Sequence, residues 1–176
     1  DAYTSLPKIE GRYEFSEIIQ LDSTYKKDDL YRNAKLFFTD AFKNAKEVLQ
    51  YDDRQEGKVI GKGNLQNNAY QVVFLAVYSE KRTTNFTLEI FCKDGKYRYR
   101  IYGIDSDFAT TVSGGNTPDR ITTGSVDLDE AYNETVKGSL KKLNRKLFFD
   151  TVIGLNDMRE LLKHYMGQKQ AKDNDF

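Results

Sequence analysis

The sequence contains one cysteine, one histidine, two prolines and no tryptophan among its 176 residues. A lone cysteine cannot form a disulfide within the chain, and together with one histidine it cannot supply the ligands of an ordinary zinc site. The sequence has no run of about 18 apolar residues, so it predicts no transmembrane segment. Nothing in these residue types calls for a metal or an organic cofactor, and we expect none.

An excess of charge of either sign is also missing, because 27 Lys+Arg stand against 27 Asp+Glu. Proteins that bind nucleic acid or anionic lipid through their overall field carry a clear excess of lysine and arginine. Nucleic acid is therefore an unfavoured partner, and such binding would require a local basic patch.

Tyrosine and phenylalanine are abundant, with 12 and 11 residues, and with so few prolines they favour β-sheet. Residues 12–21 alternate in polarity as a strand does. A helix of about five turns should follow, with Ser23 and Thr24 as candidate N-caps. Its apolar positions recur at helical spacing and form a broad stripe suited to a sheet: Leu30, Ala34, Phe37 and Ala41.

Several strands come next, and four of them pair as two hairpins. We expect strands at 46–51, 58–65, 70–78, 84–93 and 96–104. Gly57 can close the first hairpin with a positive φ, and Gly61 and Gly63 predict a close approach by the packed helix. Asp94-Gly95 is the preferred pair for a type I′ turn, and this two-residue loop fixes the register of the last hairpin.

That register gives the last hairpin one apolar face and one polar face. On the polar face it sets Glu89 opposite Arg100 and Phe91 opposite Arg98. The apolar side chains should be buried against the helix positions Leu30, Phe37 and Ala41: Leu88, Ile90, Tyr99 and Ile101. The other face should be left open to solvent and carries Glu89, Phe91, Arg98, Arg100 and Tyr102.

Residues 105–125 are polar, with two adjacent glycines, and predict a long loop that is the least ordered internal segment. A helical region returns with Leu140, Leu143 and Leu147, and Gly154 is a candidate point at which it splits. The fold class is therefore α+β, a curved antiparallel sheet of about five to six strands with two helices packed on one face. We expect an irregular lead-in at 1–11, a single domain at 12–166 and a polar disordered tail at 167–176.

Three stretches carry a family resemblance: KDDLYRNAKLFF (27–38), DRQEGKVIGKG (53–63) and KDGKYRY (93–99). In this order they resemble a bacterial family of exported domains of unknown function described as having a TBP-like fold. The resemblance implies a β-α-β4-α order and brings no catalytic residues. Family members often have tryptophan in the first helix, where this chain has Phe37 and Phe38. With the missing initiator methionine, the resemblance also implies an exported protein, periplasmic or at the cell surface.

The open face is the candidate binding site, formed by Glu89, Phe91, Arg98, Arg100 and Tyr102. The interleaved basic and aromatic residues 96–102 suit a platform for single-stranded nucleic acid, but Tyr97 and Tyr99 should point into the core. A protein interface therefore fits this face better.

Other candidates each have a structural interpretation beside a functional one. A basic helix face can sit on a membrane or an acidic partner, although a solvated face explains it as well: Lys137, Lys141, Lys142, Arg145 and Lys146. The carboxylates Asp52, Asp53 and Glu56 suit a cation or acid/base site but also an ordinary charged turn. Cys92 is expected in the core, and His164 in the last turn of the final helix.

The sequence therefore predicts a non-enzymatic exported binding or protein-interaction domain with an unknown protein or small-molecule partner. A nucleic-acid-binding module that uses the open face and a small hydrolase are the alternatives. Nothing in the sequence predicts the oligomeric state.

Overall fold

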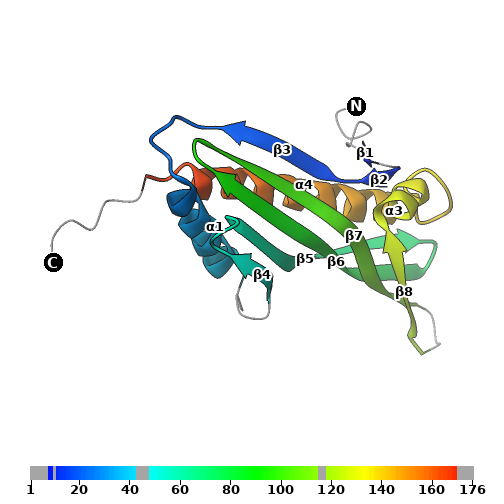
Figure 1. The fold of residues 1–176 in the computed structure, drawn as a ribbon. Helices are drawn as coiled ribbons and strands as arrows, with labels where there is room; N and C mark the ends of the chain where they lie inside the picture. Colours follow the sequence, from blue (N-terminus) through cyan, green and yellow to red (C-terminus); the bar gives the residue numbers. More distant parts are fainter. Residues whose placement is uncertain (1–7, 10, 43–47, 115–117, 170–176) are drawn as a thin grey trace. The chain divides into compact units, whose positions relative to one another are not determined.

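A computed structural model describes residues 8–9, 11–42, 48–114 and 118–169. Within these residues one sheet has the strand order β3-β7-β6-β5-β4, and β8 pairs with β7 (Figure 1). The elements are β1 (Lys8–Ile9), β2 (Arg12–Tyr13), β3 (Phe15–Gln20), α1 (Lys27–Ala41), β4 (Leu49–Asp53), β5 (Lys58–Val73), β6 (Ala76–Lys93), β7 (Lys96–Ser113), β8 (Arg120–Asp127), α3 (Leu128–Glu134) and α4 (Lys141–Met166). The α+β fold with an open six-stranded antiparallel sheet is confirmed.

The long polar loop predicted at 105–125 is wrong. β7 continues to Ser113 and pairs with β8 from Asp105↔Asp127 to Val112↔Arg120. Most residues of β8 are exposed, so the apolar alternation that reveals a strand is missing there. The backbone ladder and β-branched threonines hold this hairpin, and neither gives a strong signal in the sequence.

The two ends of the chain also differ in part from expectation. The lead-in contains β1, which pairs with β2 through Lys8↔Tyr13. At the start of the predicted tail, the Gly167 carbonyl accepts a hydrogen bond from the Tyr25 hydroxyl at 2.7 Å. Residues 170–176 lie outside the described part of the chain.

The chain divides into two compact units. Unit 1 comprises Asp1–Glu14, Asn64–Phe86 and Tyr102–Asn156, and unit 2 comprises Phe15–Gly63, Thr87–Ile101 and Asp157–Phe176. The long strands β5, β6 and β7 and the helix α4 contribute residues to both units.

In unit 2 the predicted core is confirmed except at one position. Six of the seven predicted residues are fully buried, namely Leu30, Phe37, Leu88, Ile90, Tyr99 and Ile101. Ala41, near the end of α1, is only half-buried. A Cβ at Gly61 would lie 2.4 Å from Cε1 of Phe38, which confirms the close approach of the helix to this strand.

The start of α1 is capped from a distant part of the sequence. The expected N-caps Ser23 and Thr24 are wrong, because the N-cap is Lys26 and its side chain makes no capping hydrogen bond. Instead the Asp94 carboxylate accepts a hydrogen bond from the Lys27 amide at 2.7 Å. Local spacing in the sequence does not show which turn will lie at a helix end, so this cap could not be predicted.

The Asp94-Gly95 turn was predicted to be of type I′, and this prediction is wrong. Gly95 has φ +70°, but among the described residues only Phe74 is a non-glycine residue with positive φ, and type I′ requires positive φ at both central residues. The Gly95 amide donates to the Tyr25 carbonyl at 2.9 Å. The turn therefore serves the helix start as well as the hairpin. Gly57, with φ +73°, closes its turn as predicted.

In unit 1 the first part of α4 packs on β5 and β6. Leu143 and Leu147 form a buried cluster with Ala69. The predicted break at Gly154 is wrong, because α4 runs unbroken through this residue. A Cβ there would lie 3.0 Å from Cδ1 of Leu65, so this glycine makes room for a neighbouring strand rather than ending the helix.

A buried polar cluster also lies in unit 1. Arg82, with 2% of its side chain exposed, donates to Glu80 at 2.7 Å, and Glu80 also accepts from the Thr110 hydroxyl at 2.8 Å. Burial of a charged pair is costly unless its hydrogen bonds are made. The pair is satisfied, which explains how charged residues can occupy this interior.

Candidate interaction site

The candidate site lies in unit 2, on the outward side of β3, β6 and β7. Side chains alternate between the two sides of a strand, so the register decides which ones share a face. β3 pairs with β7 with Ile18 opposite Arg98 and Gln20 opposite Lys96. The structure thereby adds β3 to the face that the sequence assigned to one hairpin.

Two shallow hollows flank Phe91 and Arg98 on this side. The first has a volume of about 220 Å³ and is lined by Ile18, Gln20, Phe91, Lys93, Lys96, Tyr97 and Arg98. The second has a volume of about 370 Å³ and is lined by Glu56, Lys58, Phe91 and Arg98. Phe91 and Arg98 line both hollows and so form the ridge between them. We call the surface of Ile18, Lys58, Phe91, Lys93, Lys96 and Arg98 the Phe91 face.

Arg98 is held in place by two partners on β6. Its guanidinium donates to Oε1 of Glu89 at 3.0 Å and lies 6.0 Å from the centre of the Phe91 ring. The predicted pairing of Arg98 with Phe91 is therefore present. The ammonium of Lys93 lies 5.2 Å from the same ring.

Glu89 differs from the expectation of a solvent-exposed residue. Only 6% of it is exposed, and its carboxylate lies 3.3 Å from the Lys58 ammonium as well as beside Arg98. These two long side chains cover it from neighbouring strands, which explains its burial on an open face. The sequence placed Glu89 opposite Arg100, which is half-buried in the structure.

The Phe91 face carries more positive than negative charge. Four cations, namely Lys58, Lys93, Lys96 and Arg98, line the two hollows, against one lining carboxylate, Glu56, and the neighbouring Glu89. Glu56 accepts a hydrogen bond from the Tyr51 hydroxyl at 3.1 Å. Ile18 and Lys58 were not predicted, because only pairing with distant strands brings them to this face. Lys93 and Lys96 were overlooked, although the register of the hairpin already places them beside Phe91 and Arg98.

The remaining predicted residues of the open face divide between the two units. Arg100 belongs to unit 2, whereas Tyr102 belongs to unit 1 and is not part of the Phe91 face. Tyr97 and Tyr99 are 2% and 0% exposed, so the predicted separation of aromatic and basic side chains is confirmed. Burial raises the pKa of the Tyr97 hydroxyl above its usual range.

On the inner side of β3 a polar cluster joins this strand to α4. The Tyr99 hydroxyl donates to Glu17 at 2.7 Å and accepts from Nε of Arg159 at 2.8 Å. The Lys163 ammonium lies 3.1 Å from the same carboxylate. The hydrogen bond from Tyr99 and then that from Lys163 hold the pKa of Glu17 below its usual value. The cluster was not predicted. The only local pattern that points to it is the spacing of Arg159 and Lys163 by about one helical turn, which places two cations on one side of the helix.

The carboxylates at 52–56 are each engaged by other residues. Asp52 pairs with Lys35 and accepts from the Tyr31 hydroxyl, and burial together with this hydrogen bond raises the pKa of Tyr31 to about 12. Asp53 accepts from the Glu56 amide at 2.9 Å. Within the described ranges no group of three His, Cys, Asp or Glu residues is placed to hold a metal ion.

Cys92 and His164 occupy the places that were predicted for them. Cys92 is fully buried, and this burial raises the pKa of its thiol to about 12. A thiol with so high a pKa is a poor nucleophile at neutral pH. His164 lies in the last turn of α4 and is exposed.

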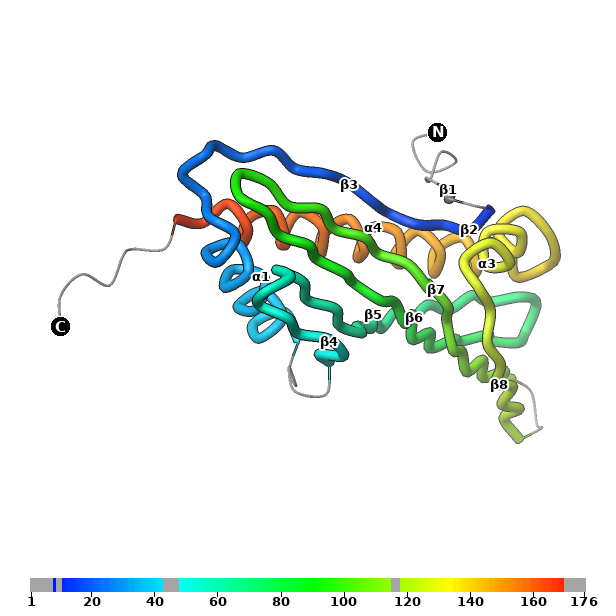
Figure 2. Tube along the Cα trace, viewed as in Figure 1, coloured from blue at the N-terminus to red at the C-terminus, as the bar shows by residue number. Residues whose placement is uncertain are grey.

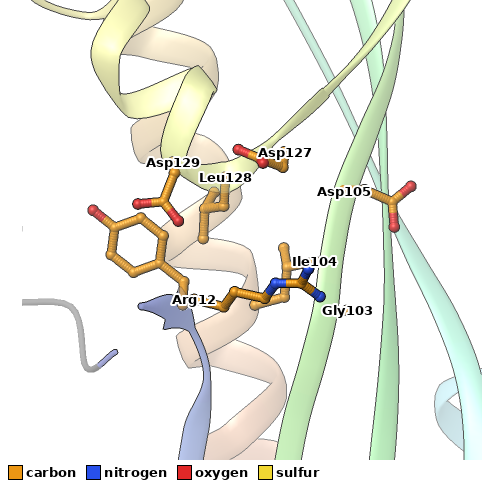
Figure 3. A pocket seen from close by; sticks show the side chains of 8 residues that line it. Arg12, Gly103, Ile104, Asp105, Asp127, Leu128 and Asp129 are labelled. Atoms are coloured by element: carbon orange, nitrogen blue, oxygen red, sulfur yellow. The ribbon is translucent and has the colours of Figure 1, made fainter. Parts of the chain in front are cut away.

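Another hollow, of about 290 Å³, lies in unit 1 where β2, β7 and the start of α3 meet (Figure 3). Three aspartates line it, yet Asp127 caps α3 by accepting from the Glu130 amide at 2.8 Å, and Asp129 pairs with Lys8. In Figure 3 Asp105 projects from its strand away from the other two carboxylates. These carboxylates do not converge on one point, so the hollow offers no shared ligand set.

Comparison with known proteins identifies the family. Residues 15–106 match the family described as "Domain of unknown function (DUF4468) with TBP-like fold". The chain belongs to the DUF4468 family. The predicted resemblance is therefore confirmed. No curated protein matches the sequence.

Two solved structures share the fold with this DUF4468 chain. A DUF4468 family protein from Bacteroides ovatus ATCC 8483 superposes with a TM-score of 0.57 at 16% identity, covering 95% of this chain and 93% of that one. A TBP-like protein from Parabacteroides distasonis ATCC 8503 superposes with a TM-score of 0.50 at 11% identity, covering 90% and 97%. At these identities the likeness shows the fold alone. None of the helices in the described residues has the length and apolar character that a membrane span needs.

Proposed function

We propose that this DUF4468 protein is a non-enzymatic exported interaction domain that binds a protein segment at the Phe91 face. The observation that carries the proposal is the ridge of Phe91 and Arg98 between hollows of about 220 and 370 Å³. Aromatic and arginine side chains in this arrangement are enriched at the centres of protein interfaces.

The two hollows favour single side chains over a whole small molecule. Typical small-molecule sites enclose about 300 to 1,000 Å³, so the first hollow is too small and the second only just large enough. β3 ends the strand order beside the first hollow, and an extended segment can add to such an edge. A protein segment that lays alternate side chains into the hollows therefore fits this face.

Charge and polarity define the chemistry of the segment. Ile18 is 61% exposed and shares the first hollow with Phe91, so this hollow suits an apolar side chain. The surrounding cations, in excess over the carboxylates, favour acidic residues on either side of it. The proposed ligand is thus an extended segment with one apolar residue between acidic ones.

Two other functions receive less support from the geometry. A nucleic-acid platform stacks successive bases on several aromatic rings beside its cations, and the Phe91 face offers a single ring, because Tyr97 and Tyr99 are in the core. A hydrolase that works by paired carboxyl groups needs one with a raised pKa close to another. Among the described carboxyl groups with a resolved shift, only Glu134 has a raised pKa, because burial and then the charges of Glu80 and Glu130 outweigh the effect of Arg82. Glu80 is buried and already held by Arg82 and Thr110, so this pair offers no open position for a substrate.

A peptide-display selection on the full chain tests the proposal. We expect enriched peptides with an apolar residue flanked by Asp or Glu, and dissociation constants that rise about tenfold for Lys96→Glu or Ile18→Ser. Lys81→Glu, at an exposed lysine of unit 1, is the matched control and should leave the affinity unchanged. Peptides that bind all four proteins equally would place the site elsewhere.

The nucleic-acid alternative is tested with the same variants. The wild-type protein should not be retained on heparin or single-stranded DNA at physiological salt. Tight, salt-sensitive retention that Lys96→Glu abolishes would replace the protein-interaction proposal. Export is supported by the family resemblance of the motifs at 27–38, 53–63 and 93–99, and cell fractionation with antibody detection tests it.

A further inference from the structure

The β5–β6 hairpin of unit 1 exposes an apolar end. Its turn residues Phe74 and Leu75 are 98% and 90% exposed. In Figure 2 this turn is the blue-green loop that joins β5 to β6. Behind the turn Tyr70, Val72 and Val77 are also exposed. We call these five residues the hairpin tip. Soluble surfaces seldom gather large apolar side chains at one such point.

The backbone conformation of the tip is a second indication that its apolar side chains have a function. Phe74 has φ +55°, a conformation that glycine adopts at little cost and an aromatic residue does not. In a two-residue hairpin loop the first central position commonly holds glycine when its φ is positive. The chain therefore keeps a ring at a position where glycine would make the turn more stable, and such local strain is typical of functional positions.

The sequence around the tip is free of charge. No charged residue occurs between Lys62 and Glu80, although 31% of the chain is charged. Charged side chains would have to be desolvated when the hairpin entered an apolar medium. Their absence removes that cost for the whole outer part of the hairpin.

Basic residues lie behind the tip in one segment, which contacts the hairpin at Gln71. Gln71 donates to the Ser139 carbonyl at 2.9 Å and accepts from the Leu143 amide at 3.0 Å, which fixes the start of α4 beside this strand position. Lys137, Lys141 and Lys142 belong to this segment and are exposed. These lysines are part of the basic cluster that the sequence singled out and that the Phe91 face does not use.

The rise per residue along a strand gives the distance of each side chain from Phe74 at the end of the tip. At about 3.3 Å per residue, Val72 lies about 7 Å behind Phe74, Gln71 about 10 Å and Tyr70 about 13 Å. Peripheral proteins bury apolar side chains about 5 to 10 Å into the boundary between headgroups and acyl chains. Phe74, Leu75 and Val72 would then lie among acyl chains, with the Tyr70 hydroxyl and the lysines at the level of the lipid phosphates.

We propose that the hairpin tip inserts into the surface of a lipid bilayer, with the lysines at 137–142 binding anionic headgroups. The tip lines none of the hollows described above, and its exposed side chains stand on a turn whose backbone lies beside Gly114. Fluid lipid adapts to such an exposed apolar turn, whereas a protein partner would need a matching pocket. This membrane contact is independent of the peptide binding proposed for the Phe91 face, because the two surfaces share no residues.

The protein's lack of tryptophan allows a direct test. In the full chain Phe74→Trp gives a single fluorescent reporter at the tip. With vesicles of phosphatidylcholine mixed with phosphatidylglycerol, we expect a blue shift of its emission and quenching by lipids with brominated acyl chains. Phe74→Gly, which suits the positive φ and should fold at least as well, should lower vesicle partitioning by about tenfold or more.

Two further variants separate the parts of the proposal. Lys141→Ala with Lys142→Ala should weaken binding to the mixed vesicles, remove its salt dependence and leave binding to pure phosphatidylcholine unchanged. Ile121→Ser, at another exposed apolar residue of unit 1, should change nothing. Absence of vesicle binding, or binding that Phe74→Gly leaves intact, would overturn the proposal. An emission shift of the Phe74→Trp protein that grows with protein concentration without lipid would also overturn it, because a second copy of the chain would then cover the tip.

Discussion

The carboxylate of Glu17 is the point at which β3 is tied to the end of α4. It accepts a hydrogen bond from Tyr99 and lies beside Lys163, and both interactions favour its charged form. Because its pKa is lower in the folded than in the unfolded protein, Glu17 stabilises the fold above the unfolded value of about 4.3. This contribution should be lost as the pH falls through the lower folded value.

Glu17→Gln should therefore have a smaller free energy of unfolding than the wild type at pH 7. The difference should shrink steadily below about pH 4.5, because the wild-type carboxyl then becomes protonated as well. Urea denaturation at a series of pH values measures both proteins. Asp119→Asn, at an exposed position, is the control and should follow the wild type throughout. A difference between Glu17→Gln and wild type that is constant with pH would show that shape rather than charge matters at this position.

Among the elements, α1 depends on a turn that lies 67 residues away from its start. Asp94 accepts from the Lys27 amide, so it both satisfies a free N–H group and places a negative charge at the positive end of the helix dipole. The hairpin and the helix are therefore stabilised together rather than separately.

Asp94→Ala should lower the free energy of unfolding by about 1 kcal/mol, the usual cost of a lost N-cap. Asp94→Asn keeps an acceptor oxygen without the charge, and we expect it to lose less. Chemical denaturation of the three proteins gives the comparison. If Asp94→Asn is as unstable as Asp94→Ala, the charge rather than the hydrogen bond carries the effect.

Over the whole molecule, alternating apolar patterns predicted the buried faces of the strands at 84–93 and 96–104. The continuous apolar run at 70–78 misled, because the strand predicted there is broken by the exposed turn Phe74-Leu75 between β5 and β6. The residues Leu88, Ile90, Tyr99 and Ile101 alternate with polar ones and were placed correctly in the core. β8 and the end of β7 were missed, because their residues are mostly exposed and their ladder leaves no apolar pattern.

The candidate site was predicted only where one hairpin determines it. Phe91 and Arg98 could be placed on one face from the register of their own turn, and they line both hollows. Ile18 and Lys58 come from strands distant in the sequence, and the burial of Glu89 depends on Lys58, so no local pattern could show them. The division into two units, which separates Tyr102 from the Phe91 face, is likewise a property of the folded chain.

The contact between Gly61 and Phe38 can be tested with paired substitutions. Since a Cβ at 61 would lie 2.4 Å from the ring, Gly61→Ala should destabilise the protein by about 1 to 3 kcal/mol through overpacking. Phe38→Leu in the same chain should recover part of this loss, which a double-mutant cycle of unfolding free energies measures. Strictly additive effects would mean that the ring moves aside without cost.

Because one volume must hold both side chains, Gly61 and Phe38 are expected to change together during evolution. In relatives where the helix residue is smaller, the strand can carry alanine or serine, and where the helix residue is as large as tryptophan the strand should keep glycine. The pair would then appear as covarying columns in an alignment of the family. Such covariation would record the distance between this helix and this strand in sequence alone.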